Sequence, residues 1–276
     1  FFGSEANPLD VKPDRLITTR ETLDDDDIAL ELIPAHSGET EDALFIRDTK
    51  HDILFVGDAF MPYVGAPFAA EGSAEGFLDA ISDVLALSPR RVIHGHPPLT
   101  GLFTPIALQG LQPAMAALYQ HTLQGARDAR PLAELLHDDF IPSNLRDAPK
   151  SVMPYLVARE TFIQRVYTEH AGYWKSNGDG IEPFTRSEWA KALNELGGGS
   201  DEPFVKVADQ LEARGDAGLA LQIAQLGLAS HPNSATLEAT RGRALTSLRQ
   251  MNSQLNPFRF IVYSEFAGRG LPAVSR

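Results

Sequence analysis

The stretch Asp52-Ile-Leu-Phe-Val-Gly-Asp58 is an apolar run that ends in a glycine and an aspartate. The run from Ile53 to Val56 favours a buried strand, and Gly57 permits a tight turn directly after it. Asp58 therefore follows a strand end, where a rigid sheet holds a side chain in a fixed position. An aspartate at such a place is also a common cap of the next helix, and this alternative stays open.

Two further segments place zinc-type ligands where strands are expected to end. Gly38-Glu39-Thr40 follows a run of alternating apolar residues, and His94-Gly95-His96 follows a strand expected over Arg91-Val92-Ile93. A helix expected over 73–87 joins the strand before Asp58 to the strand before the histidines, and α/β sheets place their sites beyond the carboxyl ends of such strands. Carboxylate oxygens and imidazole nitrogens are ligands of Zn²⁺ in hydrolytic sites. Three such side chains hold one ion poorly and two ions not at all.

Composition excludes several classes of function. The chain has 276 residues, of which 43% are hydrophobic, a formal net charge of −13 and no cysteine. This is typical of a globular protein long enough for two domains. The negative charge argues against a nucleic-acid partner, and no apolar run approaches the roughly 18 residues of a membrane span. Without cysteine, a metal would take its ligands from His, Asp and Glu.

The first 105 residues and the remainder differ in pattern. The first part indicates an α/β fold, with strands expected over 28–33, 43–46, 52–56 and 91–93. The second part has helical periodicity over 105–126, 130–136, 151–171 and 185–196, then a glycine-rich linker and three helices between 202 and 248. Gly215 and Pro232 bound a helix pair spaced as in a tetratricopeptide repeat, although generic packing helices explain it equally well.

The order of the three ligand segments resembles the second half of the metallo-β-lactamase fold. The motifs of that family in this half are Gly-His-Thr-Pro-Gly, Phe-Thr-Gly-Asp and Gly-His-Gly. The chain has Gly38-Glu39-Thr40-Glu41-Asp42, Phe55-Val56-Gly57-Asp58 and Gly95-His96-Pro97. The resemblance implies that Asp58 is a catalytic residue that bridges two metal ions and that His96 is the last ligand of the second ion. His94 is then a supporting or turn residue.

Glu39 stands where the family usually has a histidine. A glutamate at this position resembles the alkylsulfatase branch, whose two-zinc site takes acidic ligands in this half. The expected metal ligands are therefore Glu39, Asp58 and His96, and His36 is the alternative to Glu39. An anionic oxygen in place of a neutral nitrogen would raise the electron density on the metal and make a zinc-bound water somewhat less acidic.

The resemblance to alkylsulfatases continues into the helical part. The segment from Arg159 to Tyr167, RETFIQRVY, and Gly172-Tyr173-Trp174 after it resemble the start of their helical dimerisation region. The expected fold is α/β then all-α: part of a metallo-β-lactamase αββα sandwich over residues 1–125, and a helical, tetratricopeptide-like dimerisation region over residues 126–276. Arg159 and Arg165 are candidates to meet a sulfate or an acid, or to form ion pairs on a helix face.

One metal motif of the family has no counterpart in the sequence. The family's His-x-His-x-Asp-His motif should lie well before Glu39, and none of the eight histidines fits it. The chain also opens with Phe1-Phe2-Gly3, which is expected to be an interior segment of a longer protein. We therefore expect the complete protein to supply the missing ligands from residues before this segment.

The resemblance implies a metal-dependent hydrolase that cleaves a small-molecule ester. A sulfate ester is the first choice of substrate, and a carboxylic ester or a lactone is the alternative. In the complete protein, two zinc ions would share Asp58 and a hydroxide that attacks the ester. The expected assembly is a homodimer. The competing hypothesis is a non-catalytic remnant or fragment whose helical region mediates dimerisation or partner binding.

Overall fold

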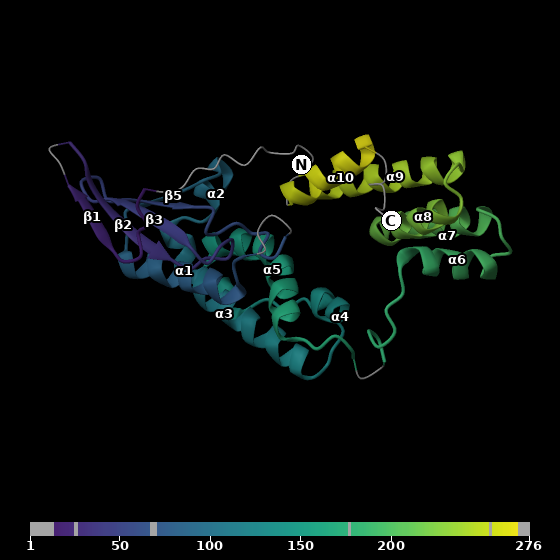
Figure 1. Ribbon diagram of the computed structural model, residues 1–276, viewed down its shortest axis with the longest axis horizontal. Coiled ribbons are helices and arrows are strands. Elements are labelled where there is room, and N and C mark those ends of the chain that lie inside the picture. The colour runs from purple at the N-terminus through teal and green to yellow at the C-terminus, as the bar shows by residue number, and fades with distance from the viewer. Residues whose placement is uncertain (1–13, 25–26, 67–70, 176–177, 254–255, 270–276) are drawn as a thin grey trace. The chain divides into compact units, whose positions relative to one another are not determined.

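The computed structural model describes residues 14–24, 27–66, 71–175, 178–253 and 256–269 (Figure 1). The chain divides into two compact units, one up to residue 177 and the other from residue 178. A small mixed sheet and several helices form the first unit, and the elements of the second unit are helices. This agrees with the expected order of α/β followed by all-α. The domain boundary expected at residue 125, which was drawn from the family resemblance, stays a prediction.

The sheet of the first unit has five strands in sequential order: β1 (Glu21–Asp24), β2 (Ala29–Ala35), β3 (Ala43–Asp48), β4 (Ile53–Gly57) and β5 (Arg91–His94). The first four strands pair antiparallel, and β5 pairs parallel with β4. A parallel neighbour needs a crossover connection, which α1 (Ala74–Leu87) supplies. The carboxyl ends of β4 and β5 therefore lie at the same edge of the sheet.

The two faces of the sheet have different surroundings. On the inner face, Phe45, Leu54 and Val56 are buried in one core with residues of α1 and α3 (Pro105–Arg127), and Figure 1 shows both helices on that side. Side chains alternate along a strand, so Leu44 and Phe55 belong to the outer face. They are 38% and 39% exposed. The outer face thus presents apolar side chains to solvent within the described residues.

Further helices complete the first unit: α2 (Pro97–Leu102), α4 (Leu132–His137), the 3₁₀ turn η1 (Ser143–Arg146) and α5 (Pro149–His170). Helices α3 and α5 pack along each other and bury Leu118, Tyr155 and Phe162. Arg159 on α5 is also buried, and its guanidinium donates to the carbonyls of Leu136 and Asp138 at the end of α4. These backbone contacts occupy Arg159 in place of the sulfate contact or helix-face ion pair expected for it.

The second unit contains α6 (Arg186–Leu196), α7 (Glu202–Ala213), α8 (Ala217–Ser230), α9 (Ala235–Asn252) and α10 (Pro257–Arg269). Helix α8 packs against α6, α7 and α9, and α10 packs against α9. Small residues such as Ala208, Ala220 and Ala244 are buried between them and permit close packing. The three helices expected between 202 and 248 are confirmed, whereas their likeness to a tetratricopeptide repeat stays a prediction. In the part of the chain that the structure describes, no helix is long and apolar enough to cross a membrane.

Candidate functional site

Asp58 and His96 meet at the edge where β4 and β5 end. The Nδ1 atom of His96 lies 2.8 Å from Oδ1 of Asp58, and the two side chains are 60% and 21% exposed. The turns that carry them are joined by a hydrogen bond of 2.8 Å from the backbone N–H of Gly95 to the carbonyl of Gly57. Gly57 has a φ of 56°, in the region that favours glycine. The parallel pairing of β4 and β5 thus joins a carboxylate and an imidazole from separate parts of the sequence.

Asp58 does not cap the next helix, so that alternative is wrong. The cap of α1 is Ser73, whose Oγ accepts a hydrogen bond of 2.8 Å from the backbone N–H of Gly76. The Asp58 carboxylate faces His96 instead. It is therefore not needed to begin the helix.

Glu39 belongs to the same electrostatic group. Burial raises the pKa of the Glu39 carboxyl, the negative charge of Asp58 raises it further, and His96 lowers it. His36, the alternative ligand, is exposed and instead interacts electrostatically with Asp83. Glu39 thus interacts electrostatically with Asp58 and His96, and the choice between Glu39 and His36 as a metal ligand stays a prediction.

The turn that carries Glu39 is held by backbone contacts. The Oγ atom of Ser37 accepts hydrogen bonds from the backbone N–H groups of Glu39, at 3.2 Å, and Thr40, at 3.1 Å. The backbone N–H of Gly72 donates to the carbonyl of Glu39 at 2.9 Å. A Cβ atom at Gly72 would lie 2.4 Å from the backbone of Gly38, so glycine is required for this close approach.

Side chains of helix α5 contact the backbone next to this turn. The Arg165 guanidinium donates to the carbonyl of Gly72, and its Nε lies 2.6 Å from Oε1 of Glu169. Thr161, one turn earlier, donates through its hydroxyl to the carbonyl of Pro62. Arg165 therefore forms the helix-face ion pair that was one of its two expected roles, and it also links α5 to the backbone beside Glu39.

His94 supports the end of β5 from the interior. It is 5% exposed, and burial lowers the pKa of its imidazole, so the ring is neutral. Its Nε2 lies 3.1 Å from the carbonyl of Phe103 and therefore carries the proton, while the Thr100 hydroxyl accepts from its backbone N–H at 3.0 Å. These contacts tie the end of β5 to α2 and the residue after it.

A second group of ligand-type side chains was missed in the sequence. Within the described residues, Glu75, Glu169 and His170 each offer a ligand atom within 4.8 Å of the others. Glu39, Asp58 and His96 do not reach this mutual spacing as a trio. The only sequence signal for the second group is the adjacent Glu169-His170 pair at a helix end.

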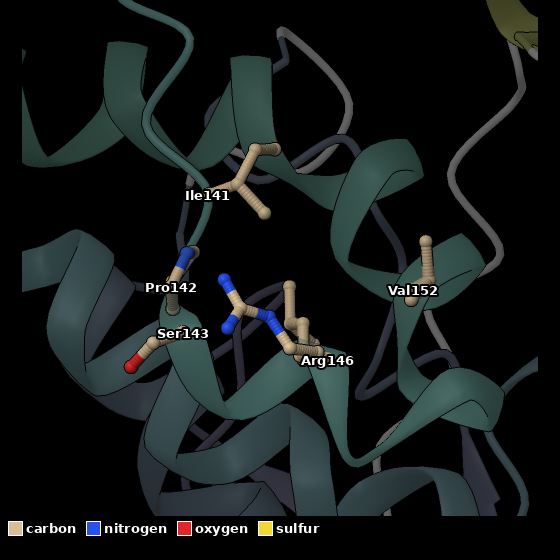
Figure 2. A pocket seen from close by; sticks show the side chains of 6 residues that line it. Ile141, Pro142, Ser143, Arg146 and Val152 are labelled. Carbon is tan, nitrogen blue, oxygen red and sulfur yellow. The ribbon is translucent and has the colours of Figure 1, made fainter.

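A cavity of about 370 Å³ lies elsewhere in the first unit, beside η1 and the start of α5 (Figure 2). Figure 2 shows the side chain of Arg146 pointing toward Pro142 and away from Val152. The lining contains none of the candidate site residues: it is formed by Ile141, Pro142, Ser143, Leu145, Arg146 and Val152. This cavity therefore adds no support to the site at the sheet edge.

Two solved structures of one enzyme match nearly the whole chain. The stereoselective inverting sec-alkylsulfatase PisA1 from Pseudomonas sp. matches with a TM-score of 0.73 and 18% identity over 94% of this chain. A double mutant of PisA1 matches with a TM-score of 0.74 and 19% identity over 95% of this chain. The chain spans 42% and 43% of those two chains.

No family model and no curated protein matches the sequence. Identity this low between two structures establishes a common fold and leaves activity open. The resemblance to alkylsulfatases seen in the sequence is therefore confirmed as a fold that this chain shares with a sec-alkylsulfatase.

Proposed function

We propose that the chain is part of a metal-dependent hydrolase that cleaves a sulfate or another small-molecule ester. The observation that carries the proposal is the contact between Asp58 and His96 at the ends of two parallel strands, with Glu39 coupled electrostatically to both. The fold shared with a sec-alkylsulfatase supports a sulfate ester as the substrate class. Because the chain spans less than half of that enzyme, the activity is proposed for a longer protein.

The donor set fits zinc. Two carboxylates and an imidazole are ligands that Zn²⁺ accepts, and a cation between Glu39 and Asp58 would offset the burial and the repulsion that together raise the pKa of Glu39. In the complete protein, where further residues would supply the missing ligands, Glu39, Asp58 and His96 would be part of a two-zinc site. Zinc in such a site supplies an electrophile and lowers the pKa of water.

The roles of the protein side chains follow from their contacts. Asp58 holds the His96 ring through Nδ1, so Nε2 is the ring nitrogen left to bind a metal. Glu39 supplies the partly buried carboxylate, held in place by the backbone contact to Gly72. His94 keeps the end of β5 fixed from the interior.

The sheet supports the remaining part of the fold proposal, the αββα sandwich. Its outer face exposes Leu44 and Phe55, which form an apolar surface of the kind that a second layer covers. We propose that this layer comes from the part of a longer protein that the chain does not span.

Zinc binding by single variants tests the function. Glu39→Gln, Asp58→Asn and His96→Asn should each lower the zinc bound at this site, measured by calorimetric titration of the purified chain. His51→Asn is the matched control, because His51 Nδ1 lies 2.7 Å from Oδ2 of Asp48 with 66% and 24% side-chain exposure. Zinc affinities of the three variants equal to that of His51→Asn would overturn the assignment.

The substrate class needs an activity assay. The same three substitutions in the longer protein should abolish release of sulfate from a secondary alkyl sulfate, measured by ion chromatography. Release of an alcohol from a carboxylic ester, with no sulfate release, would move the proposal to the alternative substrate. Zinc binding without hydrolysis of either ester would contradict the hydrolase itself.

Dimerisation through the helical unit is the second part of the proposal, and it is also the core of the non-catalytic alternative. Phe184 and Trp189 pack edge to face with ring centroids 5.9 Å apart, yet they remain 57% and 53% exposed. Exposed apolar patches on a helical unit favour a protein partner. Sedimentation equilibrium should show a dimer, and Trp189→Lys should weaken it. A monomer at every concentration would contradict this part alone.

A further inference from the structure

The ends of two helices bring Glu75, Glu169 and His170 together on the first unit. Glu75 lies in the first turn of α1, and Glu169 and His170 lie in the last turn of α5. His170 Nε2 is 3.3 Å from Oε1 of Glu75. Ligand atoms bound about 2.0–2.1 Å from a tetrahedral zinc ion lie about 3.3 Å apart. This pair of atoms therefore already has the spacing of two zinc ligands.

Tyr119 on α3 holds the two helix ends in place. Its hydroxyl donates to Oε1 of Glu75 and lies 3.2 Å from Nε2 of His170. Its ring meets the rings of Phe162 and His170 edge to face, with centroids 6.5 Å and 6.0 Å away. Because Phe162 is fully buried, the cluster rests on the core of the unit. The hydrogen bond to Oε1 would orient the Glu75 carboxylate toward an ion, whereas the contact with Nε2 of His170 would give way to an ion bound there.

The charges around the cluster favour a cation. Glu169 contacts Arg165 through Oε1, which is one of its two carboxylate oxygens. Burial raises the pKa of Glu75, but the hydrogen bonds from Tyr119 and His170 bring it below its usual value, so this carboxylate is charged. The last turn of a helix carries partial negative charge, which attracts a cation. The side chains of Glu75, Glu169 and His170 are 47%, 20% and 33% exposed, so an ion can reach them from solvent.

We propose that Glu75, Glu169 and His170 form a metal site for a divalent ion of the zinc class, distinct from the site at Asp58. The imidazole selects a transition metal over Ca²⁺ and Mg²⁺, which prefer oxygen ligands alone. An ion there would clamp the start of α1 to the end of α5. This proposal does not depend on the hydrolase function.

The competing explanation is a polar network that fastens α1, α3 and α5 without any ion. Such a network also loses stability when His170 is replaced, so loss of stability alone does not decide between the two. Only the metal site predicts that added zinc stabilises the chain and that this gain disappears with His170. The experiment therefore measures metal binding and metal-dependent stability together.

The test uses the full chain with Glu39→Gln and His96→Asn, which remove the site at the sheet edge. We expect this double variant to bind about one Zn²⁺ per chain in a calorimetric titration, and zinc to raise its melting temperature. Adding His170→Asn, or Glu169→Gln as a second variant, should weaken zinc binding at least ~10-fold and abolish the melting shift. Adding Tyr119→Phe in place of these substitutions should weaken zinc binding less than His170→Asn or Glu169→Gln does.

His121→Asn in the same background is the matched control. His121 also faces a carboxylate, with Nε2 3.2 Å from Oδ2 of Asp138, but it lies outside the cluster. This control should bind zinc as the background does. No zinc binding by the background, or equal binding with and without His170→Asn, would overturn the proposal. An equal melting shift with Ca²⁺ would overturn the assignment to a transition metal.

Discussion

Replacing Gly95 by alanine should move the Asp58 carboxylate without removing any ligand. The added Cβ would lie 2.6 Å from Oδ1 and 3.1 Å from Cγ of Asp58, so the carboxylate must turn away. These atoms are the end of a short, rotatable side chain, and the turn itself costs little. The contact of 2.8 Å with Nδ1 of His96 is then lost.

The expected change in the free energy of unfolding is small. The contact between Asp58 and His96, whose side chain is 60% exposed, is worth no more than an exposed ion pair, about 0.2–1 kcal/mol. Replacing glycine by alanine restricts the unfolded chain and contributes about 0.4–1 kcal/mol in the opposite direction. The two effects offset each other, so Gly95→Ala should change stability by less than ~1 kcal/mol. Zinc affinity at the sheet edge should fall ~10-fold or more, because a ligand is misplaced.

Gly72→Ala is the matched comparison. Its Cβ would lie 2.4 Å from the carbonyl carbon and oxygen of Gly38, which are backbone atoms that cannot rotate away. Overpacking of this kind costs about 1–3 kcal/mol. Urea unfolding followed by circular dichroism, with zinc titration of both variants, measures the contrast. If Gly95→Ala loses as much stability as Gly72→Ala, or binds zinc as the wild type does, the reasoning about Asp58 is refuted.

Three further changes probe the surroundings of the site and the two units. Arg165→Met removes the contact with the Gly72 carbonyl and should speed amide exchange at Gly72, while Arg165→Lys should restore part of the protection; equal exchange in both would contradict the contact. Phe45→Ala empties a fully buried position and should lower the free energy of unfolding by about 3–5 kcal/mol, measured in urea. Hydrogen bonds from the backbone and hydroxyl of Thr185 lower the pKa of Glu188. The capping box therefore stabilises α6 fully at pH values above 4.5, the usual pKa of this carboxyl, and the stabilisation is lost as the pH falls through the lowered pKa. Glu188→Gln should reduce the loss of amide protection that α6 shows as the pH falls. A loss equal to that of the wild type would contradict the capping role.

The elements with strong periodicity were predictable from the sequence. The strand expected over 52–56 is β4, shifted by one residue, and the helix expected over 73–87 is α1. Strand β1 was missed because three of its four residues are exposed, so it lacks a core-facing alternation. Helix α2 was missed because six residues, two of them prolines, are too short to show a helical period.

The two candidate sites differ in how far the sequence specifies them. The meeting of Asp58 and His96 follows from a strand–helix–strand unit, whose parallel strands end at one edge. Tyr119 lies 44 residues from Glu75 and 51 residues from His170. These three meet only because α1, α3 and α5 pack against one another, and periodicity does not specify which turns come together.

The candidate ligands at the sheet edge are held by two separate sets of backbone contacts. A hydrogen bond between the backbones of Gly57 and Gly95 fixes Asp58 and His96, so this half of the candidate site depends on the sheet. The turn of Glu39 depends on Gly72, whose carbonyl is bound by Arg165 from α5.

A double-mutant cycle follows from this division, because substitutions that act through one element are not additive. Arg165→Met should weaken zinc binding in the wild-type chain and add little once Glu39 is already glutamine. In a chain that carries a His96 substitution instead, Arg165→Met should weaken zinc binding as much as it does in the wild-type chain. This outcome would mean that the helical part of the first unit is needed for the proposed site as well as for the core under the sheet.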